Sequence, residues 1–266
     1  LALWAAAQGI ADVSDVALIN RLRKAGPWLG QVLTQMLERT VDLPERPAEP
    51  LRVRLIDATT ISRPGSKGTD WRLHVGFDLQ KLMIDHVEVT DATGGEQLTR
   101  HPAQAGEVAI VDRGYAHRAG IAAYAAEGAF VIVRLNWQNV PLQDAEGQPF
   151  DLLKFLRDLS DGVVGESLVQ TAPDPKHKVP AVAGRLIAVR KSPQDAETAR
   201  RKLRQAASKS GKTLLAETLE AAGYIFVFTT LAATRLPTPQ VLELYRFRWQ
   251  IEMAFKRYKS LLELDA

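Results

Sequence analysis

The chain has 266 residues, of which 46% are hydrophobic and 24% are charged, with a formal net charge of +3 at pH 7. This is the composition of a globular protein, and it excludes a disordered chain, a collagen or a coiled coil as a description of the whole. Cysteine is absent, which excludes disulfides, a thiolate nucleophile and a cysteine-ligated zinc site, and no apolar run approaches the ~18 residues of a membrane span.

The first part of the chain, residues 1–43, is predicted to be helical. Ser14 is a suitable N-cap for a helix that ends at Gly26, and Pro27 suits the first turn of a second helix. Residues 44–50 contain three prolines, which forbid a helix and predict a stiff linker. We therefore expect a small N-terminal helical region that is separated from the rest of the chain.

The sequence after this linker has the pattern of an α/β protein. A helix is predicted at 119–127. Strands are predicted at 51–56, 71–79, 82–89, 108–111, 129–135 and 224–229. Three strands in succession, followed by strands that alternate with helices, predict a mixed sheet in an α/β layer architecture.

Residues 136–224 interrupt this pattern and are interpreted as an insertion into a core formed by 51–135 and 225–266. The insertion is expected to hold short strands around Leu168 and at 186–189, and a long basic helix near 194–222. The basic run at 190–212 is either a solvated helix face or a track for phosphate groups. A final helix is predicted to begin at Thr238.

Two acidic residues, Asp57 and Asp112, directly follow apolar strand segments. Side chains at the carboxyl ends of strands in an open α/β sheet converge on the crevice where ligands bind. The alternative is that each aspartate simply opens a turn.

The final helix carries a polar stripe. At about 100° per residue, Tyr245, Arg248, Glu252 and Lys259 fall within a stripe roughly 60° wide. The alternative is a salt-bridged surface helix, in which Glu252 pairs with Arg248 and Lys256.

These residues resemble a known family. Asp112-Arg113-Gly114-Tyr115 matches a D-x-G-[YF] box, and the stripe matches the signature Y-(2)-R-(3)-E-(6)-K. In this order they are similar to bacterial insertion-sequence transposases of the DDE type, in the insertion-sequence-four group. The resemblance implies a ribonuclease H-like fold, in which a mixed sheet is flanked by helices and a β-rich insertion precedes the last catalytic helix.

The resemblance also implies the chemistry. Asp57, Asp112 and Glu252 are expected to hold two Mg²⁺ or Mn²⁺ ions for in-line phosphoryl displacement, with Asp57 shared between them. Arg248 and Lys259 are expected to clamp DNA phosphates with the help of Tyr245, and Lys256 is a further DNA-binding candidate.

Relatives stack a flipped base on an aromatic residue just before the strand that precedes the glutamate helix. Tyr224 stands at that point, where better-known members have tryptophan. It is therefore a candidate platform for a flipped base, and the alternative is a tyrosine at the edge of the core.

The function expected from the resemblance is metal-dependent cleavage of transposon-end DNA and strand transfer, in the bacterial cytoplasm at the nucleoid. The partners expected are double-stranded DNA (terminal repeats and target) and, in the synaptic complex, a second copy of the chain. Two alternatives stay open, a nuclease with the same fold and an inactive DNA-binding remnant. The second arises because the sequence stops shortly after Lys259, which we interpret as a C-terminal truncation.

Overall fold

The computed structural model describes residues 9, 13–24, 51–63, 65–66, 68–160, 162–211 and 213–262. The chain divides into two compact units, residues 1–50 with 80–82, and residues 51–79 with 83–266. In the first unit, helix α2 spans Asp15–Lys24, and the backbone N–H of Ala17 donates to Ser14 Oγ at 3.2 Å. This confirms the predicted N-cap. The predicted second helix and the proline linker lie outside the described residues.

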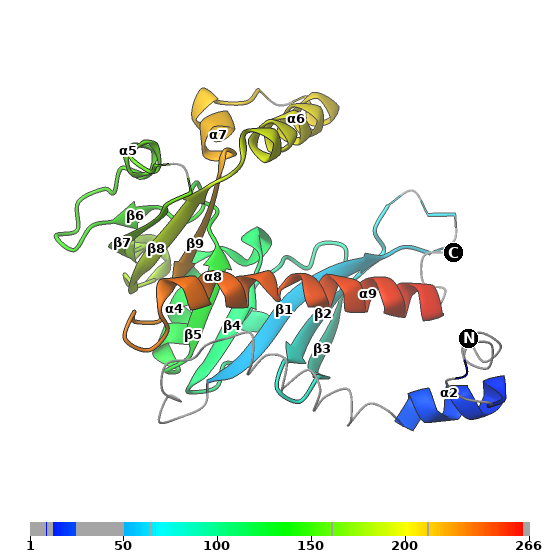
Figure 1. Cartoon of the computed structure of the whole chain (residues 1–266). Coiled ribbons are helices and arrows are strands. Elements are labelled where there is room, and N and C mark those ends of the chain that lie inside the picture. The colour runs from blue at the N-terminus through cyan, green and yellow to red at the C-terminus, as the bar shows by residue number, and fades with distance from the viewer. Residues whose placement is uncertain are drawn as a thin grey trace. The chain divides into compact units, whose positions relative to one another are not determined.

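The second unit is built on one nine-stranded mixed sheet with the strand order β3-β2-β1-β4-β5-β9-β8-β7-β6 (Figure 1). Strands β1, β4 and β5 are parallel to one another, and every other neighbouring pair is antiparallel. The predicted mixed sheet is therefore confirmed. The strands are β1 Arg52–Ile61, β2 Trp71–Asp78, β3 Met83–Asp91, β4 Glu107–Val111, β5 Phe130–Arg134, β6 Leu142–Gln143, β7 Val164–Thr171, β8 Ala183–Arg190 and β9 Tyr224–Thr229.

Helices pack on the sheet. Helix α4 contacts β5, and helix α9 contacts β1. Figure 1 shows α8 and α9 following one another across the strands. The helices are α4 Arg118–Ala126, α5 Leu152–Arg157, α6 Pro193–Ser210, α7 Ala216–Ala221, α8 Thr238–Arg246 and α9 Trp249–Leu262, with 3₁₀ turns η1 Leu98–Arg100, η2 Arg113–Tyr115 and η3 Pro175–His177. Among the described residues, none of these helices is long and apolar enough to cross a membrane.

The segment 136–224 extends the core sheet. Its strands β6, β7 and β8 lie beyond β9 in the sheet, and β7 and β8 confirm the two predicted strands. The single basic helix predicted near 194–222 is wrong, because α6 and α7 are separate helices. Helix α6 ends at Gly211, whose φ of 64° is in the left-handed region that glycine adopts without strain.

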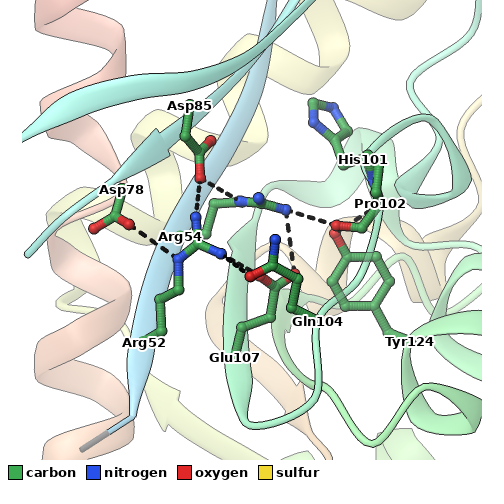
Figure 2. Close-up of polar contacts among 9 residues, drawn as sticks. All are labelled: Arg52, Arg54, Asp78, Asp85, His101, Pro102, Gln104, Glu107 and Tyr124. Atoms are coloured by element: carbon green, nitrogen blue, oxygen red, sulfur yellow. Dashed lines mark hydrogen bonds and ion pairs between the residues drawn. The ribbon is translucent and has the colours of Figure 1, made fainter. Parts of the chain in front are cut away.

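A buried polar network fixes the start of β1 (Figure 2). Arg54 Nε donates to Asp85 at 2.9 Å and its Nη1 lies 3.2 Å from Glu107, while Arg52 Nε donates to Asp78 at 2.9 Å. The carboxylates belong to β2, β3 and β4, so the two arginines tie β1 to all three strands. Arg54 and Glu107 are 3% and 1% exposed, and buried charges of this kind are tolerated only when they are paired. The network therefore holds β1 and β4 in register.

Candidate active site

Asp57 lies on β1 with its side chain on the face opposite to that of Ile56, because successive side chains of a strand alternate. Ile56 is buried in the core that includes residues of α4, whereas Asp57 lines a pocket with residues of α9. The prediction that the strand ends at Asp57 is wrong. Pairing with β4 ends at Ile56↔Val111, but β1 continues to Ile61 because its antiparallel pairing with β2 continues.

Asp112 directly follows β4, as predicted. It precedes the 3₁₀ turn η2, and its carbonyl accepts a hydrogen bond from the Tyr115 N–H at 3.1 Å. The ring of Tyr115 is fully buried and anchors the turn in the core. Since Ile56 and Val111 are the last register pair of two parallel strands, Asp57 and Asp112 are the next residues along these strands and lie beside each other.

The polar stripe spans two helices instead of the predicted single one. Helix α8 ends at Arg246 and α9 begins at Trp249. Across the junction the backbone bonds run from residue i to i−3, as in Arg248 N to Tyr245 O at 3.1 Å and Gln250 N to Phe247 O at 2.9 Å. Such bonds tighten a helix locally, so they end α8 without breaking the course of the chain.

The structure brings most of the predicted site residues together. Asp57, Asp112, Arg248, Glu252 and Lys256 line one open pocket of about 400 Å³. One nitrogen of Arg248, Nη1, lies 2.7 Å from Glu252 Oε1 and 3.6 Å from Asp57 Oδ2. The ion pair of the surface-helix alternative therefore exists, but it forms inside the pocket.

Tyr245 also reaches this site. Its hydroxyl donates a weak hydrogen bond of 3.4 Å to Asp112 Oδ1. Burial raises the pKa of the phenol above its usual range, and the charge of Asp112 raises it further. The hydroxyl is therefore a neutral donor at any physiological pH.

The carboxylate of Asp57 is destabilised by its surroundings. Burial is the largest cause and raises its pKa to about 6, and the negative charges of Asp112 and Glu96 act in the same direction. The N–H of Ala58, which donates to Oδ1 at 2.8 Å, and the guanidinium of Arg248 lower it. A buried carboxylate with two acidic neighbours is stabilised by a cation.

The donor set suits a hard divalent cation, because Mg²⁺ and Mn²⁺ prefer carboxylate oxygens. In the part of the chain that the structure describes, no three acidic or histidine side chains stand close enough to hold one ion as they are oriented. Nη1 of Arg248 lies between Glu252 and Asp57 in this structure. The carboxylates that line the pocket are nevertheless of the residue type that fits such a cation.

Two further predicted residues have different positions. Lys259 lies in α9, where only the course of the backbone is described. Tyr224 begins β9, is 9% exposed and belongs to the hydrophobic core cluster, and the Arg190 guanidinium lies 5.5 Å from its ring centre. Its stacking role stays a prediction that requires the ring to be uncovered.

The sequence did not predict that Lys191 of the basic run would have Arg113 and Arg134 as neighbours. Arg113 follows Asp112, Arg134 ends β5, and Lys191 follows β8. Burial is the largest cause that lowers the pKa of Lys191 to about 8, and the charges of Arg134 and Arg113 lower it further. No carboxylate among the described residues forms an ion pair with any of them. The strand-end argument used for the aspartates applies equally to Arg134.

Comparison with known proteins decides the family. Residues 48–266 match the family described as "Transposase DDE domain". The chain belongs to the DDE transposases. This transposase is also 40% identical, over 99% of its own length and 71% of theirs, to the putative transposase InsL of insertion sequence IS186A in Escherichia coli K12 and to the transposase of IS421 in Escherichia coli.

The predicted family and function are thereby confirmed. The chain is a bacterial insertion-sequence DDE transposase, an enzyme whose general activity is DNA cleavage and strand transfer and whose substrate is DNA. Use of a divalent metal is general in the family. The mixed sheet flanked by helices agrees with the ribonuclease H-like core that the resemblance implied.

Proposed function

We propose that Asp57, Asp112 and Glu252 are the catalytic carboxylates of this transposase and that they hold two Mg²⁺ or Mn²⁺ ions. The observation that supports this is the shared pocket, which collects three acidic side chains from β1, the end of β4 and α9. We assign Asp57 as the shared ligand, because it lies on β1 beside Asp112 and its side chain is more enclosed than that of Glu252, 14% exposed against 45%. Asp112 and Glu252 each complete the shell of one ion.

When bound, the two ions activate the attacking oxygen and stabilise the leaving oxygen of an in-line displacement at phosphorus. In cleavage, a water oxygen forms a bond to phosphorus, the bond to the DNA 3′-oxygen breaks, and that oxygen takes a proton. In strand transfer, the freed 3′-oxygen forms a bond to the phosphorus of another phosphodiester and loses its proton, while the bond between that phosphorus and its own 3′-oxygen breaks and the leaving 3′-oxygen takes up a proton. We propose that the opposite strand is attacked first, which gives a hairpin end. No covalent bond between protein and DNA is formed.

Arg248 has two roles in this proposal. Without metal and DNA, it neutralises Glu252 and Asp57. With DNA bound, its planar fork turns to the scissile phosphate, and Glu252 is released toward the metal. The Tyr245 hydroxyl, Lys256 and Lys259 contact the same DNA backbone and position it, and contacts of this kind carry no sequence information.

The cations Arg113, Arg134 and Lys191 continue this phosphate-binding surface away from the pocket. These three cations form no ion pair with a carboxylate among the described residues, and their positive charges repel one another, so a row of phosphates would be bound favourably here. Two copies of the chain are required in the synaptic complex, because two DNA ends have to be joined to one target.

The test uses DNA that carries the terminal repeat of the element that encodes the chain. The variants are Asp57→Asn, Asp112→Asn and Glu252→Gln, with Asp158→Asn, an exposed aspartate at the end of α5, as the matched control. We expect each of the three variants to lose end cleavage and joining by at least about 100-fold and to bind Mn²⁺ more weakly, while circular dichroism stays unchanged. Wild-type cleavage by any of the three would contradict the proposal. A product that is nicked but never joined would favour a nuclease.

A further inference from the structure

A fourth carboxylate lies at the candidate site. Glu96 is in the loop between β3 and η1 and is half-buried. Its loop is tied down by two arginines, since Arg72 Nη1 donates to the carbonyl of Gly94 and Arg100 Nε donates to that of Gly95, both at 2.9 Å. The backbone directly before Glu96 is therefore held by side chains from β2 and η1.

The Glu96 carboxylate lies directly against the D-x-G-Y turn. A Cβ atom at Gly114 would fall 1.6 Å from Glu96 Oε2 and 2.8 Å from Cδ. Gly114 does not have a positive φ, so the reason for glycine here is space and not backbone strain. Any side chain at residue 114 has to displace Glu96, or displace the turn that carries Asp112.

Glu96 also interacts electrostatically with Asp57, one of the proposed catalytic carboxylates. The negative charge of Glu96 raises the pKa of Asp57 and that of the Tyr115 phenol behind the turn. The charge of Asp112 likewise raises the pKa of Asp57. Within the described part of the chain, Glu96 forms neither an ion pair nor a hydrogen bond through its side chain. In contrast, the neighbouring Glu88 pairs with Arg100 at 2.7 Å.

We propose that Glu96 is a positioning residue of the active site. Its carboxylate seats the turn 112–115 through the contact with Gly114, and its charge adds to the negative field of Asp57 and Asp112 that attracts the divalent cation. The second part rests on the proposed function, whereas the first part depends only on packing. The glycine of the D-x-G-Y box is then required because Glu96 occupies the place of its side chain.

Four variants separate the two parts. Glu96→Gln keeps the shape and removes the charge, whereas Glu96→Ala removes both. Gly114→Ala inserts a methyl group where Oε2 lies, and the double variant Glu96→Ala/Gly114→Ala makes room for that methyl group. Glu146→Gln is the matched control, because it removes the same charge from an exposed residue. Glu146 lies close to β6, an edge strand of the sheet that is separated from β1 by several strands.

Mn²⁺ binding to the metal-free full chain, measured by electron paramagnetic resonance of free Mn²⁺, tests the charge. We expect Glu96→Gln to bind Mn²⁺ roughly 10-fold more weakly and Glu146→Gln to bind it as the wild type does. Unchanged affinity in Glu96→Gln would overturn the electrostatic role. If the wild type itself binds no Mn²⁺, or if Asp57→Asn binds it equally well, the proposed function fails instead.

Thermal unfolding of the metal-free protein tests the packing, whether or not the chain cleaves DNA. We expect Gly114→Ala to lower the unfolding midpoint by about 2–4 °C, because the new methyl group has to displace the half-buried Glu96 carboxylate from its place against the turn. The double variant should recover at least half of this loss, and it should also regain part of the cleavage that Gly114→Ala loses. Strictly additive effects of the two substitutions would overturn the contact between Glu96 and Gly114 as the reason for the glycine.

Discussion

Arg248 Nη1 lies 2.7 Å from Glu252 Oε1, and the same atom lies 3.6 Å from Asp57 Oδ2. A single cationic side chain therefore occupies the position between two carboxylates that a metal ion is proposed to take. The ion pair stabilises the metal-free protein and competes with metal binding.

Arg248→Gln is expected to change metal binding and DNA cleavage in opposite directions. Removal of the guanidinium frees two carboxylates, so Mn²⁺ affinity should rise about 10-fold. The effect is modest because Glu252 is 45% exposed and solvent screens its interaction with Arg248. Cleavage should fall at least about 10-fold, because the phosphate clamp is lost. Mn²⁺ titration and single-turnover cleavage measure the two effects, and weaker Mn²⁺ binding would contradict the prediction.

Arg113→Ala and Arg134→Ala are expected to weaken DNA binding without a change in sequence preference. Each removes one phosphate contact, so the slope of log K against log [salt] should decrease by about 0.9 for each variant. Fluorescence anisotropy with duplex DNA at several salt concentrations measures this slope. Lys176→Ala, an exposed lysine in η3, is the control and should leave the slope unchanged.

Arg54→Met is expected to destabilise the protein by about 3–5 kcal/mol, because it leaves the 1%-exposed Glu107 with a buried charge and one partner fewer. The double variant Arg54→Met/Glu107→Leu should lose clearly less than the sum of the two single changes. Urea unfolding of the four proteins gives the coupling free energy. Additive losses would show that the pair in Figure 2 does not act as a unit.

His101 is expected to make stability sensitive to acid. Burial, followed by the charges of His86 and Arg54, lowers its pKa from 6.5 to about 3. As the pH falls, His101 therefore takes up a proton in the unfolded chain but stays neutral in the native protein. The stability that this neutral histidine contributes is fully present above pH 6.5 and decreases as the pH falls toward 3.

At pH 5 this loss amounts to about 2 kcal/mol relative to pH 7.5. The unfolding free energy of His101→Leu should therefore fall less between pH 7.5 and pH 5 than that of the wild type. The difference between the two proteins should be about 2 kcal/mol. Urea unfolding at pH 5 and pH 7.5 measures the difference. An equal loss in both proteins would exclude His101 as the source.

The sequence predicted the strands of the core well, because apolar runs such as 108–111 and 129–135 can be buried only inside a sheet. The proximity of Asp57 and Asp112 followed from strand direction alone. The length of β1 did not follow, because its continuation to Ile61 depends on pairing with β2, which lies elsewhere in the chain. The junction of α8 and α9 was also missed, since neither proline nor glycine marks it.

The contacts of the site residues depended on tertiary structure. The helical stripe placed Arg248 and Glu252 on one side, but the proximity of Arg248 to Asp57 required the helix to be seated on the sheet. Glu96 gave no signal, because nothing in a single sequence relates it to Gly114. The cations Arg134 and Lys191 were hidden for the same reason, since they end strands that are far apart in the chain.

Strand β9 is hydrogen-bonded to β5 on one side and to β8 on the other. Asp57 lies on β1 and Asp112 directly follows β4, so a continuous ladder of hydrogen-bonded strands joins both aspartates to β8, the strand that leads into α6. Any displacement of β8 relative to these two aspartates has to break or shear the hydrogen bonds of that ladder.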